Sequence, residues 1–263
     1  MHYVEAGTGP LIVLLHGFPE FWYSWRHQLK TLSKDFRVVA PDLRGYNKTD
    51  KPESVSSYRM EAVARDIAEL IVELNEEEAV IVGHDWGGGV AYQFAAEYPQ
   101  LTRKLIVLNC PHPVVMSKHL RSSFAQLKRS WYMFYFQLPW LPEFLMTRNL
   151  KLIMAKTFRG WAHRRDAFSN EDIARYTEVF SKPGQAKAAI NYYRAAFRDA
   201  LDLNRKRFPK IESPTLIIWG ENDRALRKEL TFGMEKYFGE DFKVHYLADC
   251  SHWVQHDHPE TVS

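Results

Sequence analysis

A chain of 263 residues that is 46% hydrophobic and 25% charged can bury a full core, as one large domain or as a domain with an insertion. A net charge of +3 is too small to indicate a nucleic-acid partner, and the two cysteines, Cys110 and Cys250, lack the CxxC spacing of a metal or redox site. No leader-like segment follows Met1, and the charge-free stretch 130–142 is shorter than the ~20 apolar residues of a membrane span, so we expect a cytoplasmic protein without a membrane span.

Short apolar runs alternate with helix-like stretches along the chain. The runs are Leu11–Leu15, Val38–Ala40, Ala79–Val82, Leu105–Leu108, Thr215–Trp219 and Val244–Leu247. They are apolar throughout rather than at every second position, which is typical of strands buried on both faces of a parallel sheet. Helix-like stretches such as Met60–Leu74 separate them, so the pattern predicts an α/β fold with a mostly parallel sheet flanked by helices.

Residues 114–208 interrupt this alternation. They contain many aromatic residues and helical stretches such as Asp172–Phe180 and Gln185–Leu201, but no strand-like run. Prolines stand at both edges, at positions 111, 113 and 209. We therefore predict a helical cap over residues 114–208, inserted between a first core part, residues 1–113, and a second core part, residues 209–263.

The run Ala79–Val82 leads into Gly83-His84-Asp85-Trp86-Gly87-Gly88-Gly89 and then into a helix-like stretch, 90–97. This is the G-x-nucleophile-x-G form of a strained turn between a strand and a helix, and it makes Asp85 the candidate nucleophile. The glycine patterns of dinucleotide-binding and P-loop proteins are absent. A carboxylate, with a reference pKa of ~3.9, can displace a leaving group from a saturated carbon and leaves an ester that water can cleave.

Hydrolysis of such an ester requires a general base and an acidic residue that orients it. In chains with this turn the acid and then the histidine follow the nucleophile, each at the end of a strand. Asp223, in Trp219-Gly220-Glu221-Asn222-Asp223, and His252, in Ser251-His252-Trp253, fit this order. We predict that His252 is the base and that Asp223 orients it, with Glu221 as a reserve candidate for the acid.

Negative charge that develops on the Asp85 carbonyl oxygen requires backbone N–H donors. We predict that Trp86, directly after the nucleophile, supplies one donor, and that Phe18, in the loop His16-Gly17-Phe18-Pro19, supplies the other. No metal site is predicted, because His256 and His258 have no matching ligands elsewhere in the sequence.

Five motifs together resemble the soluble epoxide hydrolases of the α/β-hydrolase superfamily, in the right order and over nearly the whole chain. They are His16–Glu20, Asp42–Tyr46, Gly83–Gly88, Trp219–Asp223 and Ser251–Trp253. The resemblance implies an α/β-hydrolase fold with an inserted cap, and a cofactor-free reaction of water with a small hydrophobic epoxide that yields a vicinal diol. It also implies a monomer or homodimer.

Enzymes of this family bind the epoxide oxygen with two tyrosines of the cap. Their pattern Tyr-Phe-Gln-x-Pro is matched by Tyr135–Pro139, and their pattern Tyr-Arg by Tyr193-Arg194, so the resemblance implies Tyr135 and Tyr193, with Tyr192 as a competitor of Tyr193. A phenol with a reference pKa of ~10 can donate a proton to an alkoxide. For an apolar substrate pocket we predict the residues Pro19, Trp131, Phe134 and Trp253.

Two alternatives use the same fold. Haloalkane and haloacid dehalogenases share the aspartate nucleophile, but the former commonly carry Asn or Glu where this chain has Phe18, and fluoroacetate dehalogenases carry Arg where it has Trp86. A non-catalytic binding protein is the other alternative. The start at Met1 and the end at Ser263, soon after His252, lead us to expect a chain that is trimmed at both ends.

Overall fold

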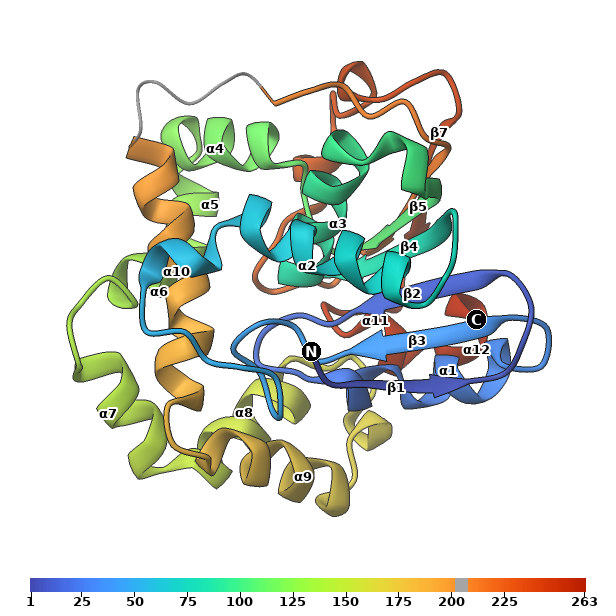
Figure 1. Ribbon diagram of the computed structural model, residues 1–263. Coiled ribbons are helices and arrows are strands. Elements are labelled where there is room, and N and C mark those ends of the chain that lie inside the picture. The colour runs from blue at the N-terminus through green and yellow to red at the C-terminus, as the bar shows by residue number, and fades with distance from the viewer. Residues whose placement is uncertain (202–207) are drawn as a thin grey trace.

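The computed structural model describes residues 1–201 and 208–263, and a twisted sheet forms its centre (Figure 1). The strands are β1 (Tyr3–Ala6), β2 (Leu11–Leu15), β3 (Arg37–Pro41), β4 (Ala79–His84), β5 (Thr102–Leu108), β6 (Thr215–Gly220) and β7 (Phe242–Leu247), in the spatial order β1-β3-β2-β4-β5-β6-β7. β1 pairs with β3 in antiparallel fashion, and the other neighbours are parallel. The mostly parallel sheet predicted from the apolar runs is therefore confirmed.

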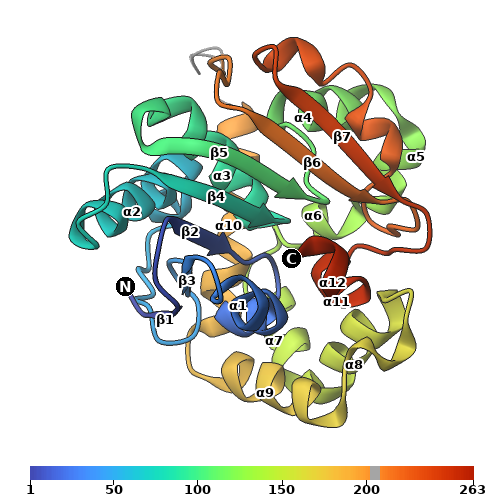
Figure 2. The same cartoon turned by 90° about the vertical axis from the view of Figure 1, so that its right-hand side faces the viewer.

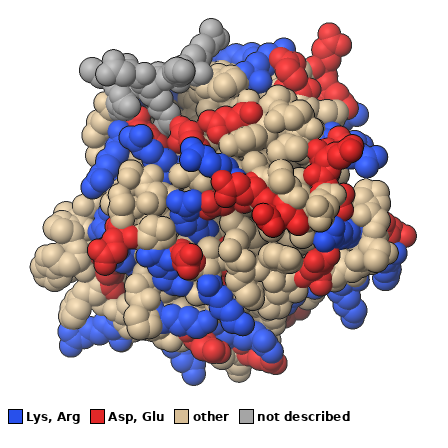
Figure 3. Space-filling view, viewed as in Figure 1, with Lys and Arg blue, Asp and Glu red and all other residues tan. Residues whose placement is uncertain are grey.

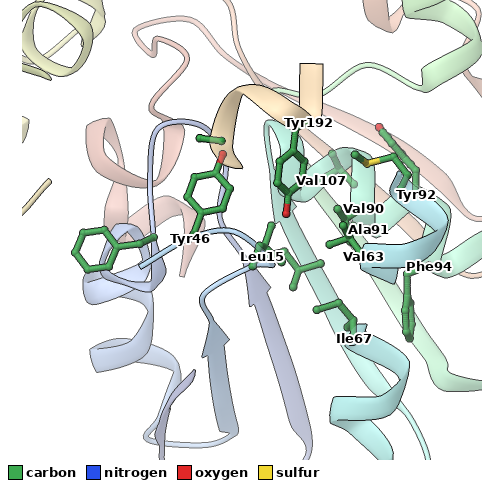
Figure 4. Close-up of a cluster of buried hydrophobic side chains, with 14 of the residues drawn as sticks. Leu15, Tyr46, Val63, Ile67, Val90, Ala91, Tyr92, Phe94, Val107 and Tyr192 are labelled. Atoms are coloured by element: carbon green, nitrogen blue, oxygen red, sulfur yellow. The ribbon is translucent and has the colours of Figure 1, made fainter. Parts of the chain in front are cut away.

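Helices cover both faces of the sheet, as the strand sequences require. All five residues of β2 are buried; Leu11, Val13 and Leu15 belong to the same apolar cluster as α2 (Met60–Glu73) and α3 (Trp86–Glu97), and Figure 4 shows part of it. The alternate residues of β2, Ile12 and Leu14, belong to a second cluster with side chains of η1 (Trp22–Trp25), α1 (Arg26–Leu32) and α11 (Val254–Asp257). A strand that is buried on both faces therefore has a continuous apolar sequence.

A group of helices lies between β5 and β6 in the chain and forms a layer beside the sheet (Figures 1 and 2). It consists of α4 (Pro113–Ser122), α5 (Phe124–Arg129), α6 (Trp131–Tyr135), α7 (Leu141–Arg148), α8 (Leu150–Trp161), η4 (Arg165–Ala167), α9 (Asn170–Ser181) and α10 (Gln185–Leu201). The proposed cap range 114–208 includes residues 202–207, which lie outside the described residues, so its far boundary stays a prediction. No helix in the described ranges is long and apolar enough to cross a membrane.

The remaining helices are short and connect the strands of the core. They are η2 (Val55–Tyr58), η3 (Pro99–Leu101), η5 (Lys228–Thr231), η6 (Glu235–Tyr237) and α12 (Pro259–Val262).

The helix α10 is held on the core by buried hydrogen bonds at the loop after β3. Tyr192 donates from its hydroxyl to the Arg44 carbonyl over 2.8 Å. Gln185, at the start of α10, donates to the Gly45 carbonyl over 3.0 Å and accepts from the Asn47 N–H over 2.8 Å. These contacts fix the rotation of α10, and they occupy the hydroxyl of Tyr192, so that the neighbouring Tyr193 is the tyrosine left to face the sheet.

Candidate active site

The turn after β4 holds Asp85 in a strained conformation. Its φ is +50° and its ψ is −120°, in a region that residues with a side chain rarely adopt. Glycines on both sides make the turn possible: a Cβ on Gly87 would lie 2.2 Å from the Leu15 carbonyl oxygen, and a Cβ on Gly17 would lie 2.5 Å from the Asp85 Cβ. The loop after β2 and the elbow after β4 therefore approach each other at the carboxylate.

The structure brings Asp85, His252 and Asp223 together at the carboxyl ends of three strands. His252 Nε2 lies 3.6 Å from Asp85 Oδ2, and His252 Nδ1 lies 2.7 Å from Asp223 Oδ2. Burial alone would lower the pKa of His252, but the carboxylates of Asp223 and Asp85 outweigh it and raise this pKa to about 10. The imidazole is thus held between two carboxylates, in the order of a nucleophile, a base and an orienting acid.

Asp223 is fixed by a set of hydrogen bonds that the sequence analysis missed in part. Its Oδ1 accepts from the backbone N–H of Ala225 and Leu226 over 2.7 and 2.9 Å, and its Oδ2 accepts from Asn109 Nδ2 over 2.7 Å. Burial raises the pKa of Asp223, but His252 and these donors bring it below its usual value. Asn109 directly follows β5, and this position at the end of a strand is the feature of the sequence that could have identified it as a site residue. The reserve candidate Glu221 instead pairs with Lys228.

A second set of buried side chains supports the loop that carries His252. His84, which precedes Asp85, has its Nε2 2.8 Å from the His252 carbonyl oxygen and its Nδ1 2.9 Å from Glu20 Oε2. Glu20 is fully buried; burial raises its pKa, but the neighbouring histidines His84 and His256 outweigh this and keep it ionised. The two ring nitrogens of His84 thus link the Glu20 carboxylate to the loop that carries His252.

One of the two predicted oxyanion donors contacts the nucleophile directly. The Phe18 N–H donates to Asp85 Oδ1 over 2.9 Å. Trp86 is the first residue of α3, so its N–H has no acceptor within the helix. The same carboxylate oxygen that Phe18 contacts would become the carbonyl oxygen if the other oxygen formed an ester.

Tyr193 lies over the nucleophile. Its ring meets those of Trp86 and Phe18 edge to face, with centroid distances of 4.8 and 5.3 Å, and these two residues flank the Asp85 carboxylate. Burial and the charge of Asp85 raise the pKa of Tyr193 well above its usual value. Its hydroxyl therefore stays protonated at neutral pH.

The second predicted tyrosine, Tyr135, does not lie at the site, and this part of the prediction is corrected by the structure. Tyr135 is half-exposed at the end of α6, where burial and the charge of Glu143 raise its pKa, and its ring packs on Trp131. Tyr132 faces the site in its place: burial and the charges of Asp85 and Asp223 raise its pKa, and its ring lies 5.8 Å from that of Tyr193.

Helical spacing explains why Tyr132 and not Tyr135 faces inward. Tyr132 lies four residues before Phe136, and side chains four apart share one face of a helix. Phe136 is buried against Phe18 and Tyr193, with ring centroids 5.7 and 4.8 Å apart. The buried position of Phe136 therefore marks the inner face of α6, and Tyr132, three residues before the matched pattern, lies on that face.

Two of the predicted pocket residues are also corrected. Trp131 is 62% exposed and Phe134 is 45% exposed, because both lie on the outer face of α6. Pro19 is buried next to Phe18, and Trp253 is buried with its ring 5.0 Å from that of His252. Trp253 donates from Nε1 to the Thr157 carbonyl over 3.3 Å, which ties the loop that carries His252 to α8.

Known proteins resemble this chain in sequence and in fold. Residues 10–259 match the family model described as alpha/beta hydrolase fold. Human epoxide hydrolase 4 is 40% identical over 268 residues, which cover 100% of this chain and 73% of that protein. Mouse epoxide hydrolase 3 is 38% identical, with 100% of this chain and 71% of that protein covered. The chain belongs to the epoxide hydrolase family. The α/β-hydrolase fold with a helical insertion is likewise confirmed.

Solved structures agree with this assignment. The Bacillus megaterium epoxide hydrolase in complex with an inhibitor is 34% identical, with a TM-score of 0.85 over 99% of this chain and 93% of that one. A variant of the same B. megaterium epoxide hydrolase, again 34% identical with a TM-score of 0.85, is described in complex with its product, (R)-3-naphthyloxy-propane-1,2-diol. The ligand-bound relatives therefore share the fold of this epoxide hydrolase homologue over nearly its whole length.

The ion pair between Asp223 and His252 is expected to make the stability of this epoxide hydrolase homologue depend on pH. Because the folded-state pKa of about 10 lies above the unfolded value of ~6.5, the pair contributes stability that is fully present below pH ~6.5 and is lost as the pH rises toward 10. Asp223→Asn removes that contribution, so we expect the melting temperature of the variant to fall below that of the wild type by more at pH 6 than at pH 10. An equal difference at both pH values, measured by calorimetry, would contradict the charge pairing.

Proposed function

We propose that this protein hydrolyses a hydrophobic epoxide to a vicinal diol in two steps, without a cofactor. The observation that carries the proposal is a carboxylate at the nucleophile position, 3.6 Å from a histidine and close to the buried Tyr193 and the partly buried Tyr132. A carboxylate attacks saturated carbon, and two neutral phenols can bind the oxygen that leaves it.

In the first step Asp85 Oδ2 attacks one carbon of the epoxide and breaks its bond to oxygen. Asp85 Oδ1 already accepts from the Phe18 N–H, so Oδ2 is the oxygen free to react and Oδ1 becomes the ester carbonyl. The alkoxide that forms takes a proton from Tyr132 or Tyr193, which removes its charge. The product of this step is a 2-hydroxyalkyl ester of Asp85.

The same step prepares the histidine for its role as a base. The free protein holds His252 as an imidazolium, partly because Asp85 is charged. Ester formation abolishes the charge of Asp85, which lowers the pKa of His252, and the imidazolium proton replaces the one that the tyrosine gave away. Ring opening therefore consumes one proton and His252 supplies it, so that a neutral imidazole faces the ester.

In the second step water attacks the ester carbonyl carbon while His252 Nε2 accepts its proton. Negative charge develops on Asp85 Oδ1, where the Phe18 N–H lies 2.9 Å away and the Trp86 N–H is free to donate. Collapse of this intermediate releases the diol, and His252 returns its proton to the departing oxygen. Asp85 keeps one oxygen atom from water and passes the remaining proton of that water to His252, which restores the carboxylate and the imidazolium.

The substrate class follows from the lining of the site and from a relative. The rings of Phe18, Trp86 and Phe136 surround Tyr193, so the space above Asp85 is apolar. The B. megaterium relative is described with a naphthyloxy propanediol as its product, which supports an aryl glycidyl ether as a first substrate to test.

The test is a single-turnover reaction of excess protein with phenyl glycidyl ether in ¹⁸O-labelled water. We expect the first diol to contain mostly unlabelled oxygen and the peptide that carries Asp85 to gain the label, both read by mass spectrometry. Asp85→Ala is the control and should form no diol. Label in the first diol would indicate direct attack by water, and halide release from a haloalkane without any diol formation would favour a dehalogenase.

A further inference from the structure

The outer face of α6, α7 and the segment between them exposes large apolar side chains. Six of them define what we call the cap apolar face: Trp131, Phe134, Leu138, Trp140, Phe144 and Leu145. Figure 3 shows uncharged atoms at the left edge of the molecule, where Figure 1 places α6 and α7. They come from one stretch of 15 residues, counted from 131 to 145, and Phe197 of α10 adjoins them through its ring contact with Phe134. An exposed apolar surface of this kind marks an interaction site.

The stretch of chain that carries this face is predominantly basic. Between residues 114 and 160 the sequence contains eight lysines and arginines, at positions 118, 121, 128, 129, 148, 151, 156 and 159. The same stretch contains a single acidic residue, Glu143, and its carboxylate is paired with Arg194 over 2.6 Å. The stretch of chain that carries the apolar side chains is therefore strongly basic, and one of its basic groups, the guanidinium of Arg148, lies 5.6 Å from the ring centre of Phe144 in the cap apolar face.

Trp140 provides an independent indication that its side chain has a function on this surface. It has a φ of +51°, which bulky residues rarely adopt, and it is 70% exposed. Glycine or asparagine would satisfy the backbone at this position with less strain. No ring contact or side-chain hydrogen bond of Trp140 is found among the described residues, so packing within the fold does not explain the tryptophan.

We propose that the cap apolar face docks on the surface of an anionic phospholipid bilayer. Tryptophan, phenylalanine and leucine side chains enter the boundary between headgroups and acyl chains, and basic residues such as Arg148, whose guanidinium lies against the Phe144 ring, are attracted to anionic headgroups. This docking needs no membrane-spanning helix, and none is present in the described residues. It would place α6, which carries Tyr132 on its inner face, next to the phase into which hydrophobic epoxides partition.

A second copy of the chain fits this face less well. Two such faces brought together would oppose their basic residues, Arg148 and Lys151 among them, and like charges at an interface reduce affinity. An anionic surface instead neutralises the same residues. The charge pattern therefore favours lipid over a homodimer.

The first experiment measures sedimentation of the protein with lipid vesicles. We expect binding to phosphatidylcholine vesicles that contain about 30% phosphatidylserine, weak binding to phosphatidylcholine alone, and a loss of affinity as salt rises from about 0.1 M to about 1 M. Equal binding to both kinds of vesicle, or no binding to either, overturns the proposal. Neither result bears on the reaction at Asp85, because the assay contains no epoxide.

Variants locate the binding surface. Trp140→Asn is expected to weaken vesicle binding about tenfold while the melting temperature stays equal or rises, since Asn tolerates the positive φ. Phe232→Asn is the matched control, because Phe232 is 58% exposed but lies on the core after η5. Arg148→Gln with Lys151→Gln should also weaken binding about tenfold, whereas Lys210→Gln with Lys243→Gln on the core should not.

The same variants separate lipid docking from dimerisation. If sedimentation velocity without lipid shows a dimer that Trp140→Asn dissociates, the face is an interface between copies and the proposal is wrong. If Trp140→Asn and Phe232→Asn bind vesicles as the wild type does, the lipid contact lies elsewhere and the proposal is equally overturned.

Discussion

His252→Gln is expected to lower steady-state diol formation by roughly 10³-fold and to leave the protein with a stable ester on Asp85. Attack by Asp85 on the epoxide needs the carboxylate and a tyrosine that protonates the alkoxide, both of which remain, and without His252 that tyrosine recovers its proton from water. Hydrolysis needs a base at Nε2, which glutamine does not supply. Mass spectrometry of the intact protein after mixing with phenyl glycidyl ether should show one added epoxide for each chain.

The location of the adduct decides between this mechanism and nonspecific alkylation. Digestion should place the added mass on the peptide that contains Asp85, and the double variant Asp85→Ala with His252→Gln should gain none. An adduct on Glu20, the other carboxylate near the elbow, would contradict the assignment of the nucleophile. Turnover at the wild-type rate would show that His252 is not the base.

The sequence predicted the sheet well because most of its strands are buried on both faces. β2 coincides with its apolar run Leu11–Leu15, and the other five predicted strands lie within the observed ones. β1 was missed because it is an edge strand of four residues, half of them exposed, and so has no apolar run. Its antiparallel pairing with β3 depends on a tertiary contact that the sequence does not reveal.

Residues at strand ends were easier to find than residues on the cap. Asp85, Asp223 and His252 each follow a strand, and parallel strands bring their carboxyl ends to one edge of the sheet. The orientation of α6 depends instead on how a five-residue helix packs against α10, and aromatic residues fill both of its faces. Sequence pattern alone therefore could not separate Tyr132 from Tyr135, or the pocket from the exposed Trp131 and Phe134.

Tyr132→Phe is expected to slow ester formation by about 10²-fold, whereas Tyr135→Phe should leave it within about twofold of the wild type. The two variants remove the same hydroxyl from the same short helix, so they form a matched pair. The charge of Asp85 contributes to the raised pKa of Tyr132, whereas the charge of Glu143 contributes to that of Tyr135. The measurement is the rate of ester accumulation in the His252→Gln background, which isolates the first step.

Tyr193 limits how far the rate of ester formation falls in Tyr132→Phe. In Tyr132→Phe the second proposed donor, Tyr193, remains, so we expect the rate to fall but ester formation to continue. The loss should be largest at high pH, where other proton donors are scarce. In the double variant Tyr132→Phe with Tyr193→Phe, the alkoxide has no phenol donor, and ester formation should drop below detection. A Tyr135→Phe variant that is slower than Tyr132→Phe would show that α6 rotates when substrate binds, and would restore the assignment made from the sequence pattern.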